Sequence, residues 1–355
     1  TAILRNVSVD WFGGLLSFLG LGCILVGIGL SGQYGWWEPK QLFAIAGVVI
    51  PPFALSIVPT LVAVGVICLG FFIFWQRQRA RRSQASLLRV GLLRKRVFVL
   101  GTLTAMLHTL VTTGVQFNLY QFIPTILKLN PIQTSLTVLP YTLTMLVVVI
   151  ALLKYLSIDD QYPPKYVLIT GIALLGTGVL ILLNAFSKKV TPLDIMPGLI
   201  VMGMGSGIFL AYIASLTYSV ASRTEKPEGS GIYNPVQNLG SSLGRGILGT
   251  ILISFSAQRI VSGIVQALGT EISPSQQQEA VKYLQRAIQT FSAEERKQLF
   301  AKLPASIKPE LNSILYASAT EAMRSSLLVA LGVVILCLFL ALGLPKYAHR
   351  RSIKE

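Results

Sequence analysis

MRSSLLVALGVVILCLFLALGLP, residues 323–345, is an almost unbroken apolar run near the end of the chain. A helix rises about 1.5 Å per residue, so a run of roughly 20 residues crosses the ~30 Å hydrocarbon core of a bilayer. Seven more such runs precede it, at 10–30, 55–75, 97–122, 132–154, 165–186, 194–219 and 230–255. Backbone groups in lipid are satisfied only in helices or closed barrels, and a barrel shows short alternating strands instead. We therefore predict an all-α polytopic membrane protein with eight transmembrane helices.

The composition supports this class and excludes others. Hydrophobic residues make up 53% of the 355 residues and charged residues only 12%, which lies outside the range of soluble domains. The net charge is +16, but the basic residues sit in connectors between apolar runs, so we expect no nucleic-acid partner. Cys23, Cys68 and Cys337 lie singly in separate apolar runs and predict neither a disulfide framework nor a metal site. We expect no cofactor and no catalytic residues.

Basic residues in short connectors predict the orientation in the membrane. The connector between the second and third runs is rich in Lys and Arg and contains no acidic residue, which marks it as cytoplasmic. Its basic residues are Arg77, Arg79, Arg81, Arg82, Arg89, Arg94, Lys95 and Arg96. Alternating outward from this loop places both ends of the chain in the cytoplasm and the long loop 256–322 outside the cell membrane.

The outer connectors carry some predicted structure of their own. Ser273 with Pro274, and Ser292 with Glu295, have the spacing of helix starts, so two short amphipathic helices are expected in loop 256–322. Residues 42–54 are apolar but too short to span, and we expect a re-entrant or interfacial segment there. The chain opens without Met or a signal-peptide pattern, which we interpret as an internal start.

Polar side chains inside the seventh run fall on one helical face. Asn234, Asn238, Ser241 and Arg245 follow one another at steps of three or four residues, and Gln237 borders them. In hydrocarbon such a stripe is costly unless it points to a cavity or another helix. Arg245 allows two interpretations, a functional charge or a structural one that snorkels to the outer interface.

The third and sixth runs repeat the pattern more weakly. His108, Thr112, Gln116 and Tyr120 lie at successive steps of four in the third run. His108 suits a proton relay, because histidine titrates near neutral pH, although a histidine satisfied by a neighbouring helix is the alternative. In the sixth run Tyr212, Ser215 and Ser219 share one side. The pairs Gly203/Gly207 and Gly240/Gly244 have the GxxxG spacing of close helix packing.

Several stretches together resemble a known family. VDWFGGLLSFLGLGCILVGIGLSGQYGW carries Asp10, Trp11, Gly13, Gly35 and Trp36, and resembles the central extra helix of the fourteen-span drug:proton antiporters of the major facilitator superfamily, the EmrB/QacA-like group. SLLRVGLLRKRVF, LNPIQTSLTVLP and EGSGIYNPVQNLGSSLG resemble, in the same order, the entry to the C-terminal domain of that group, a following turn and its glycine-rich penultimate helix. Gln237 occupies a position where the family often has arginine, and only Asp159 and Asp160 remain of a loop motif.

The resemblance implies both a domain organisation and a function. Residues 1–96 would hold two central linker helices and the basic loop, and residues 97–355 the six-helix C-terminal domain, with its N-terminal six-helix partner supplied by the rest of the chain. It implies a non-enzymatic membrane transporter for proton-coupled efflux of drugs or other small amphipathic molecules. We expect cavity contacts from Gln116, Tyr120, Tyr212, Asn234, Gln237, Asn238 and Arg245, and an influence on proton coupling from His108 and Arg245. A non-transporting scaffold or sensor is one alternative, and a polytopic membrane enzyme the other.

Overall fold

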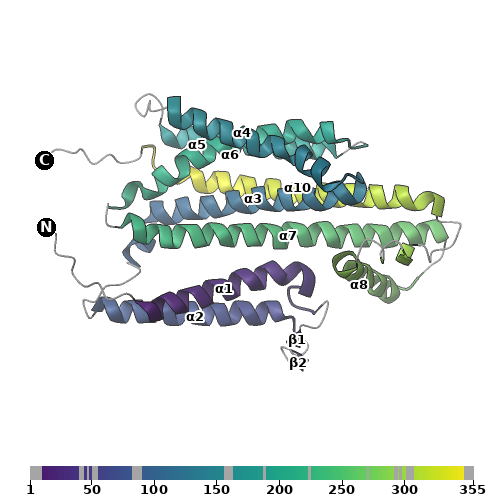
Figure 1. Cartoon of the computed structure of the whole chain (residues 1–355), viewed down its shortest axis with the longest axis horizontal. Helices are drawn as coiled ribbons and strands as arrows, with labels where there is room; N and C mark the ends of the chain where they lie inside the picture. The colour runs from purple at the N-terminus through teal and green to yellow at the C-terminus, as the bar shows by residue number, and fades with distance from the viewer. Residues whose placement is uncertain are drawn as a thin grey trace.

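The computed structural model describes residues 10–39, 44–45, 48–49, 55–81, 90–155, 163–186, 189–222, 225–269, 272–291, 295, 298–300 and 308–347. Within these residues eight helices are long and apolar enough to cross a membrane. They are α1 (Trp11–Tyr34), α2 (Ile57–Arg81), α3 (Arg96–Ile126), α4 (Pro131–Tyr155), α5 (Pro164–Ala185), α6 (Pro192–Thr217), α7 (Lys226–Leu268) and α10 (Lys308–Leu342). Each coincides with one predicted apolar run, so the predicted fold class is confirmed (Figure 1).

Prolines and capping side chains set the helix boundaries. Helices α4, α5 and α6 begin at Pro131, Pro164 and Pro192. Proline suits this position because the N–H groups of the first turn have no acceptor within the helix, and because its ring fixes φ at a helical value. The long helix α7 ends at Gly269, whose φ of +61° is strained for residues with a side chain. Two 3₁₀ turns, Val90–Arg94 and Tyr218–Val220, lie beside helix ends at the basic side of the bundle.

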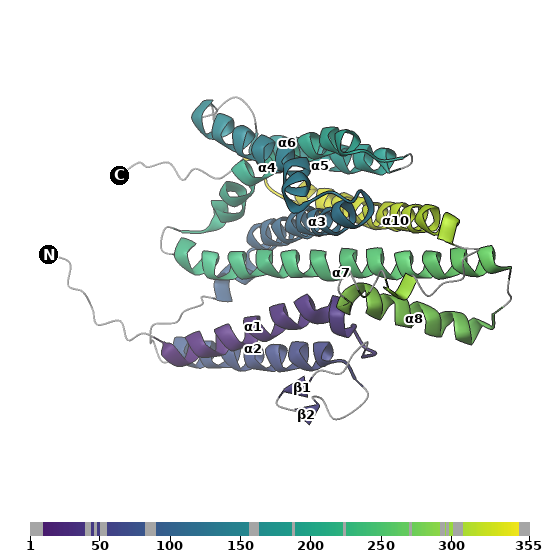
Figure 2. The same cartoon turned by 45° about the vertical axis from the view of Figure 1, so that its right-hand side comes forward.

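Helices α1 and α2 form an antiparallel pair that packs beside α7. The two backbones approach closely at Gly20 and Gly65, where a Cβ atom on Gly65 would lie 2.6 Å from the Gly20 carbonyl oxygen. Helix α1 meets α7 at Gly246, where a Cβ would lie 2.7 Å from Ser31 Oγ. Figures 1 and 2 both place the α1–α2 pair on one side of α7 and the α4, α5 and α6 group on the other, with α3 and α10 between.

The six helices α3 to α7 and α10 share one hydrophobic core. Leu119, Leu168, Ile172, Leu199 and Phe209 are among its fully buried side chains. Glycines let the helices approach: a Cβ on Gly244 would overlap the Leu110 carbonyl oxygen of α3, and one on Gly207 would lie 2.7 Å from the Met145 carbonyl oxygen of α4. The packing role predicted for both GxxxG pairs is therefore confirmed.

At the end of the bundle where α7 is followed by α10, the structure differs from the predicted loop 256–322. Helix α7 has 43 residues, so it is about 64 Å long and extends well beyond the hydrocarbon core. It continues to Leu268, and α10 already begins at Lys308. Between them, α8 (Pro274–Thr290) confirms the first predicted amphipathic helix, with Ser273 as N-cap and a capping box to Gln276.

A second, smaller hydrophobic cluster holds this extension of the bundle together. Leu284 of α8 packs against Ala257, Ile260 and Val261 of α7, so α7 covers the apolar face of the amphipathic helix α8. Of the second predicted amphipathic helix, Ser292 lies outside the described residues.

Residues 42–54 are described only in part, and those described form a strand pair. β1 (Ala44–Ile45) and β2 (Val48–Val49) pair antiparallel, with Ala44 opposite Val49. They lie near the C-terminal end of α1 and the N-terminal end of α2 (Figure 2). This accords with an interfacial segment and not with an additional span, whereas Pro51 and Pro52 lie outside the described residues.

Candidate functional site

The polar stripe predicted in the seventh run stays open to the outside of the bundle. Asn234, Asn238 and Arg245 of α7 are exposed, and Ser241 is half-buried. The Arg245 Nε–H donates to the Ser241 carbonyl oxygen at 3.4 Å, one turn earlier on the same helix. Amide and guanidinium groups therefore lie on an open side of a helix long and apolar enough to span a membrane.

Arg245 lies near the middle depth of the bundle. Its neighbour Gly244 packs directly on the Leu110 carbonyl oxygen, and Leu110 lies close to the midpoint of α3. The next charged residue outward on α7 is Arg259, 14 positions further, or about 21 Å along the helix axis. The functional and the structural interpretation of Arg245 both stay predictions.

The stripe predicted on the third run changes from buried to exposed along α3. His108 and Thr112 are buried, Gln116 is half-buried and Tyr120 is exposed by 47%. The Thr112 hydroxyl donates to the His108 carbonyl oxygen at 3.1 Å and is satisfied within its own helix. Only the outer half of this stripe, Gln116 and Tyr120, can therefore meet a solute or another segment.

The open parts of both stripes lie on the same side of the α3–α7 pair. The helices run parallel, since Gly240 packs on Met106 and Gly244 on Leu110. Each residue of a helix is rotated by about 100° around the axis, so Arg245 points about 100° away, in one rotational sense, from Gly244, the residue that faces α3. Gln116 lies about 120° from Leu110 in the opposite sense. For parallel helices in contact, opposite senses bring the two sets to one side.

Helix α10 occupies the other side of this pair. Asn118 Nδ2 of α3 donates to the Leu248 carbonyl oxygen of α7 at 3.1 Å and to Ser326 Oγ of α10 at 2.7 Å. Cys337 Sγ of α10 contacts the Thr104 carbonyl oxygen of α3 at 3.5 Å. The α3–α7 pair is thus covered on the α10 side, and the side that carries Arg245 and Gln116 is its open side.

His108 belongs to a buried cluster and does not reach the open side. Its Nε2 lies 3.2 Å from Ser206 Oγ of α6, and the Tyr141 hydroxyl of α4 donates to the same oxygen at 3.1 Å. The imidazole stacks on Phe209 with ring centroids 4.0 Å apart and planes 5° apart. The cluster joins α3, α4 and α6, which corresponds to the alternative in which neighbouring helices satisfy the histidine.

Gln237 and Tyr212 are not brought to the open side with the other predicted residues. Gln237 lies about 20° from the line of Gly244 that faces α3, is half-buried, and its Nε2 donates to the buried Tyr233 hydroxyl at 3.2 Å. Tyr212 packs against the main core, about 20° around α6 from Gly205, and Gly205 packs on α5. The open side therefore holds five of the seven predicted cavity residues.

Three polar residues that tie the helices together were missed from the sequence. Ser206, Tyr141 and Asn118 are buried, but none of them belongs to a polar stripe that the sequence predicted. Asn118 lies off the stripe of Gln116 and Tyr120 by its position in the turn. An amide inside an apolar run was the available signal for Asn118, because such a group requires a partner in lipid.

Two ionic clusters lie at the basic end of the bundle, and their carboxylates, Glu225 and Asp10, belong to residues just outside the membrane spans. Lys95 Nζ pairs with Glu225 Oε2 at 2.9 Å and also donates to the Val220 carbonyl oxygen at 2.9 Å. The Ser222 backbone N–H, the Lys95 ammonium and the Ser222 hydroxyl lower the pKa of Glu225 to about 2. This pair joins the starts of α3 and α7.

The second cluster fixes the α1–α2 pair around Asp10. The carboxylate caps α1 by accepting from the Gly13 N–H at 2.9 Å, and accepts from Trp75 Nε1 at 3.2 Å and Gln76 Nε2 at 2.7 Å of α2. Arg79 approaches it to 3.6 Å. Burial is the largest single influence and raises the pKa of Asp10, but the donors and Arg79 together outweigh it and lower the pKa below its ordinary 3.8.

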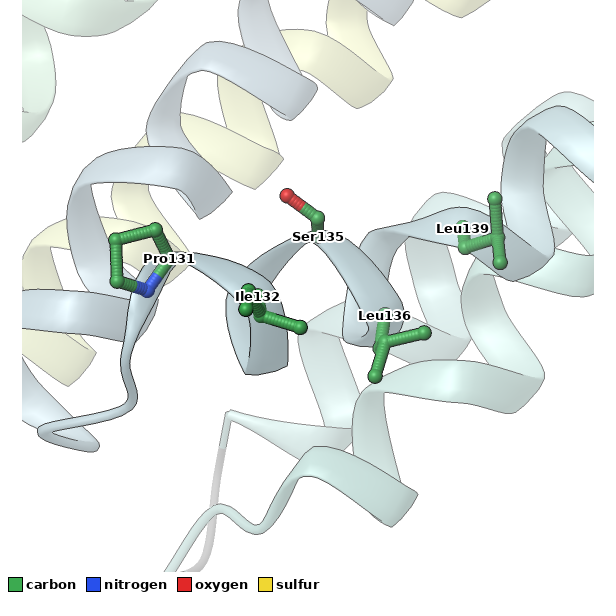
Figure 3. Close-up of a pocket in the computed structure, with 5 residues that line it drawn as sticks. All are labelled: Pro131, Ile132, Ser135, Leu136 and Leu139. Carbon is green, nitrogen blue, oxygen red and sulfur yellow. The ribbon is translucent and has the colours of Figure 1, made fainter.

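A shallow hollow lies elsewhere, at the start of α4 (Figure 3). Its volume is about 340 Å³, and Ser135 supplies its only polar side chain. It is lined by Pro131, Ile132, Ser135, Leu136 and Leu139. Without a charged or amide group it presents no basis for selective recognition, so the open side of α3 and α7 is the better candidate. Among the described residues no group of His, Cys, Asp and Glu could hold a metal ion.

Comparison with known proteins now places this bundle in a family. The family model of the Major Facilitator Superfamily matches residues 11–245, and the chain belongs to that superfamily. This accords with the resemblance in the sequence at the level of the superfamily, and it favours a transporter over a membrane enzyme.

Individual relatives are more distant. The chain is 25% identical to a probable actinorhodin transporter of Streptomyces coelicolor over 58% of this chain and 35% of the relative. It is 23% identical to the multidrug efflux pump LfrA of Mycolicibacterium smegmatis over 54% of this chain and 37% of the relative. An uncharacterized transporter of the superfamily from Mycobacterium tuberculosis is 24% identical over 72% of this chain and 40% of the relative. The aligned part spans well under half the length of these curated relatives.

Proposed function

We propose that the complete protein exports drugs or other small amphipathic molecules across the cell membrane, driven by proton exchange. Membership of the Major Facilitator Superfamily and the two relatives named as transporter and efflux pump support this. The observation that carries the proposal is the open polar side of α3 and α7, because hydrogen-bonding groups held inside a span favour a water-accessible path.

The same observation supports a larger protein around this chain. The relatives continue well beyond the aligned part, and alternating access needs two helical bundles that move around a site at mid-membrane depth. We propose that α1 and α2, with the basic connector to residue 96, are linker helices. Helices α3 to α7 and α10 then form the C-terminal six-helix domain of 97–355. A further bundle of the same chain would close the open side.

The orientation is part of the proposal. The two ionic clusters and the basic connector lie at one end of the helices, and positive charge near span ends favours the cytoplasm. This places α8 and the outer extension outside. A cysteine introduced at Gln278 of α8 should react with an impermeant maleimide in intact cells, whereas one at Arg94 should react only after the membrane is opened.

The central experiment measures efflux of ethidium by the complete protein in efflux-deficient bacteria. Alanine at the predicted contacts should slow efflux at least about tenfold, equivalent to ~1.4 kcal/mol of lost stabilisation. The predicted contacts that lie on the open side are Gln116, Tyr120, Asn234, Asn238 and Arg245. The matched control replaces Val236, Leu239 and Leu243, on the apolar side of α7, with alanine. Unchanged efflux by the variant with all five alanines would contradict the proposal.

His108 can influence coupling only through the cluster that it forms with Ser206 and Tyr141. We propose that this cluster keeps α3, α4 and α6 in register while the domain moves. His108→Gln should keep a hydrogen bond to Ser206 and retain most efflux. His108→Leu should lose both the hydrogen bond and most of the efflux. Equal loss in both variants, with normal folding, would instead indicate that the imidazole itself is required.

A non-transporting scaffold remains the second candidate, because α8 and the outer ends of α7 and α10 form a folded extension with its own apolar cluster. Deletion of residues 260–318 separates the two. An exporter should keep efflux if the shortened protein folds, and a scaffold should lose its partner without an effect on efflux.

A further inference from the structure

Arg245 is a permanent positive charge without an acidic partner among the residues that the structure describes. Among the acidic residues that the structure describes, only Glu321 of α10 lies away from the ends of a span, and it pairs with Arg259. The two that α7 itself holds or adjoins, Glu225 and Glu228, are at least 17 positions away, or about 25 Å along the axis. Ion pairs elsewhere in the described residues join Arg79, Lys95, Arg259 and Lys282 to carboxylates, and none of these pairs involves Arg245.

The surroundings of Arg245 make an unpaired charge costly. The residue lies level with the middle of α3, and its hydrogen bond to the Ser241 carbonyl uses only Nε. Within the described residues no hydrogen bond is shown for its two terminal nitrogens, and the side chains of Arg245 and Asn238 are both exposed. Arginine stays protonated at all relevant pH values and costs roughly 2.5 to 3.5 kcal/mol at the centre of a span when unpaired.

The chemistry of the two terminal nitrogens selects the partner. A planar guanidinium offers parallel N–H donors that match the two oxygens of a carboxylate, and charge-assisted pairs of this kind are stronger than neutral hydrogen bonds. Asn238 on the same side can bind a further oxygen. These groups suit a planar anion bound between α7 and the further bundle that we propose on the open side.

We propose that, in the complete protein, Arg245 binds a carboxylate on the open side of the α3–α7 pair. The carboxylate comes either from an acidic side chain of another segment of the same protein or from the transported molecule. The second source rests on the proposed export function, and the first does not. Arg245 then either locks two parts of the transporter together or selects acidic substrates.

The test measures labelling rates of single cysteines in the complete protein, with Cys23, Cys68 and Cys337 replaced by serine. Arg245→Cys and Asn238→Cys each react with two methanethiosulfonates, one carrying a sulfonate and one a trimethylammonium group. If a protein carboxylate faces position 245, removal of the arginine leaves it unpaired. The Arg245→Cys variant should then react at least about fivefold faster with the cationic reagent, since the local potential is negative.

If the carboxylate belongs to the substrate, the Arg245→Cys variant shows no charge preference. In that case Asn238→Cys, which keeps Arg245, should react faster with the anionic reagent. Carboxyfluorescein should slow this reaction, and should not slow it when Arg245→Gln is added. Asn238→Cys also tests for a protein carboxylate if Arg245→Cys does not fold. A carboxylate that is already paired with Arg245 neutralises its charge, so the thiol at position 238 should then react equally fast with the anionic and the cationic reagent.

Two outcomes would overturn the proposal. The first is labelling of both variants with no charge preference at position 245 and no protection of position 238 by carboxyfluorescein. The second is no labelling of either cysteine in folded protein, which would mean that this side of α7 faces lipid. Labelling requires no transport, so failure of the export proposal would appear separately as absence of ethidium efflux by the unaltered protein.

Discussion

The two sides of α7 obey opposite packing rules although they belong to one helix. Toward α3, Gly240 and Gly244 leave no space for even one added carbon atom beside the α3 carbonyl oxygens. On the open side, one residue further along, Arg245 is exposed with a hydrogen bond to its own helix. On the side that contacts the α3 backbone, the available space decides which residues are tolerated. On the open side, the partner that binds the polar groups decides it.

The largest effect that tests this contrast is expected from Gly244→Leu. A Cβ there would overlap the Leu110 carbonyl oxygen, and a backbone atom cannot move aside as a side chain can. We expect a cost above about 3 kcal/mol, more than ordinary overpacking, and loss of the monodisperse peak in size-exclusion chromatography. Gly231→Leu on the same helix is the control, because nothing lies within 4 Å of its Cβ.

The next effect concerns the Asp10 cluster, which holds α1 to α2 by polar contacts. Asp10→Ala leaves the donors of Trp75 and Gln76 unpaired in a buried site, so we expect a loss of about 2 to 4 kcal/mol. A thermal melt of the purified protein measures it. If Asp10→Ala melted at the temperature of the unaltered protein, the cluster would contribute no net stability.

A smaller effect is expected from Asn118→Ala on the covered side of the α3–α7 pair. The change removes hydrogen bonds to the Leu248 carbonyl oxygen and Ser326 Oγ. Polar contacts between membrane helices contribute about 0.6 kcal/mol on average and up to ~1.7, so we expect a decrease of the melting temperature by a few degrees. The double variant with Ser326→Ala should show less than the sum of the single effects, and additive effects would argue against the contact.

The smallest effect is expected at the Lys95–Glu225 pair, which water reaches. The pKa of Glu225 is lowered to about 2 in the folded protein, so its stabilisation is fully present above the ordinary value of 4.5. It is lost as the pH falls from 4.5 toward 2. Glu225→Gln should lower the melting temperature slightly at about pH 7 and remove this part of the acid dependence. High salt should reduce the difference further.

Only part of the candidate site could be predicted from the sequence. The spacing of Asn234, Asn238 and Arg245 correctly predicted a shared side of one helix, because helical period is local. It could not show that Gln116 and Tyr120 lie on the same side of the pair, nor that Gln237 is half-buried and bonded to Tyr233 of its own helix. Those outcomes depend on which residues face each other across the Gly244–Leu110 contact.

The sequence by itself determined the eight membrane-spanning helices found among the described residues, since the length and apolar character of each run decide its transfer into lipid without reference to other runs. It also determined the cap of α8 and the glycine pairs that allow close approach. Only the tertiary structure decided that His108 is enclosed by Ser206, Tyr141 and Phe209 while Arg245 stays open. Burial of a polar group depends on the helix that packs against it, and that neighbour can be far away in the sequence.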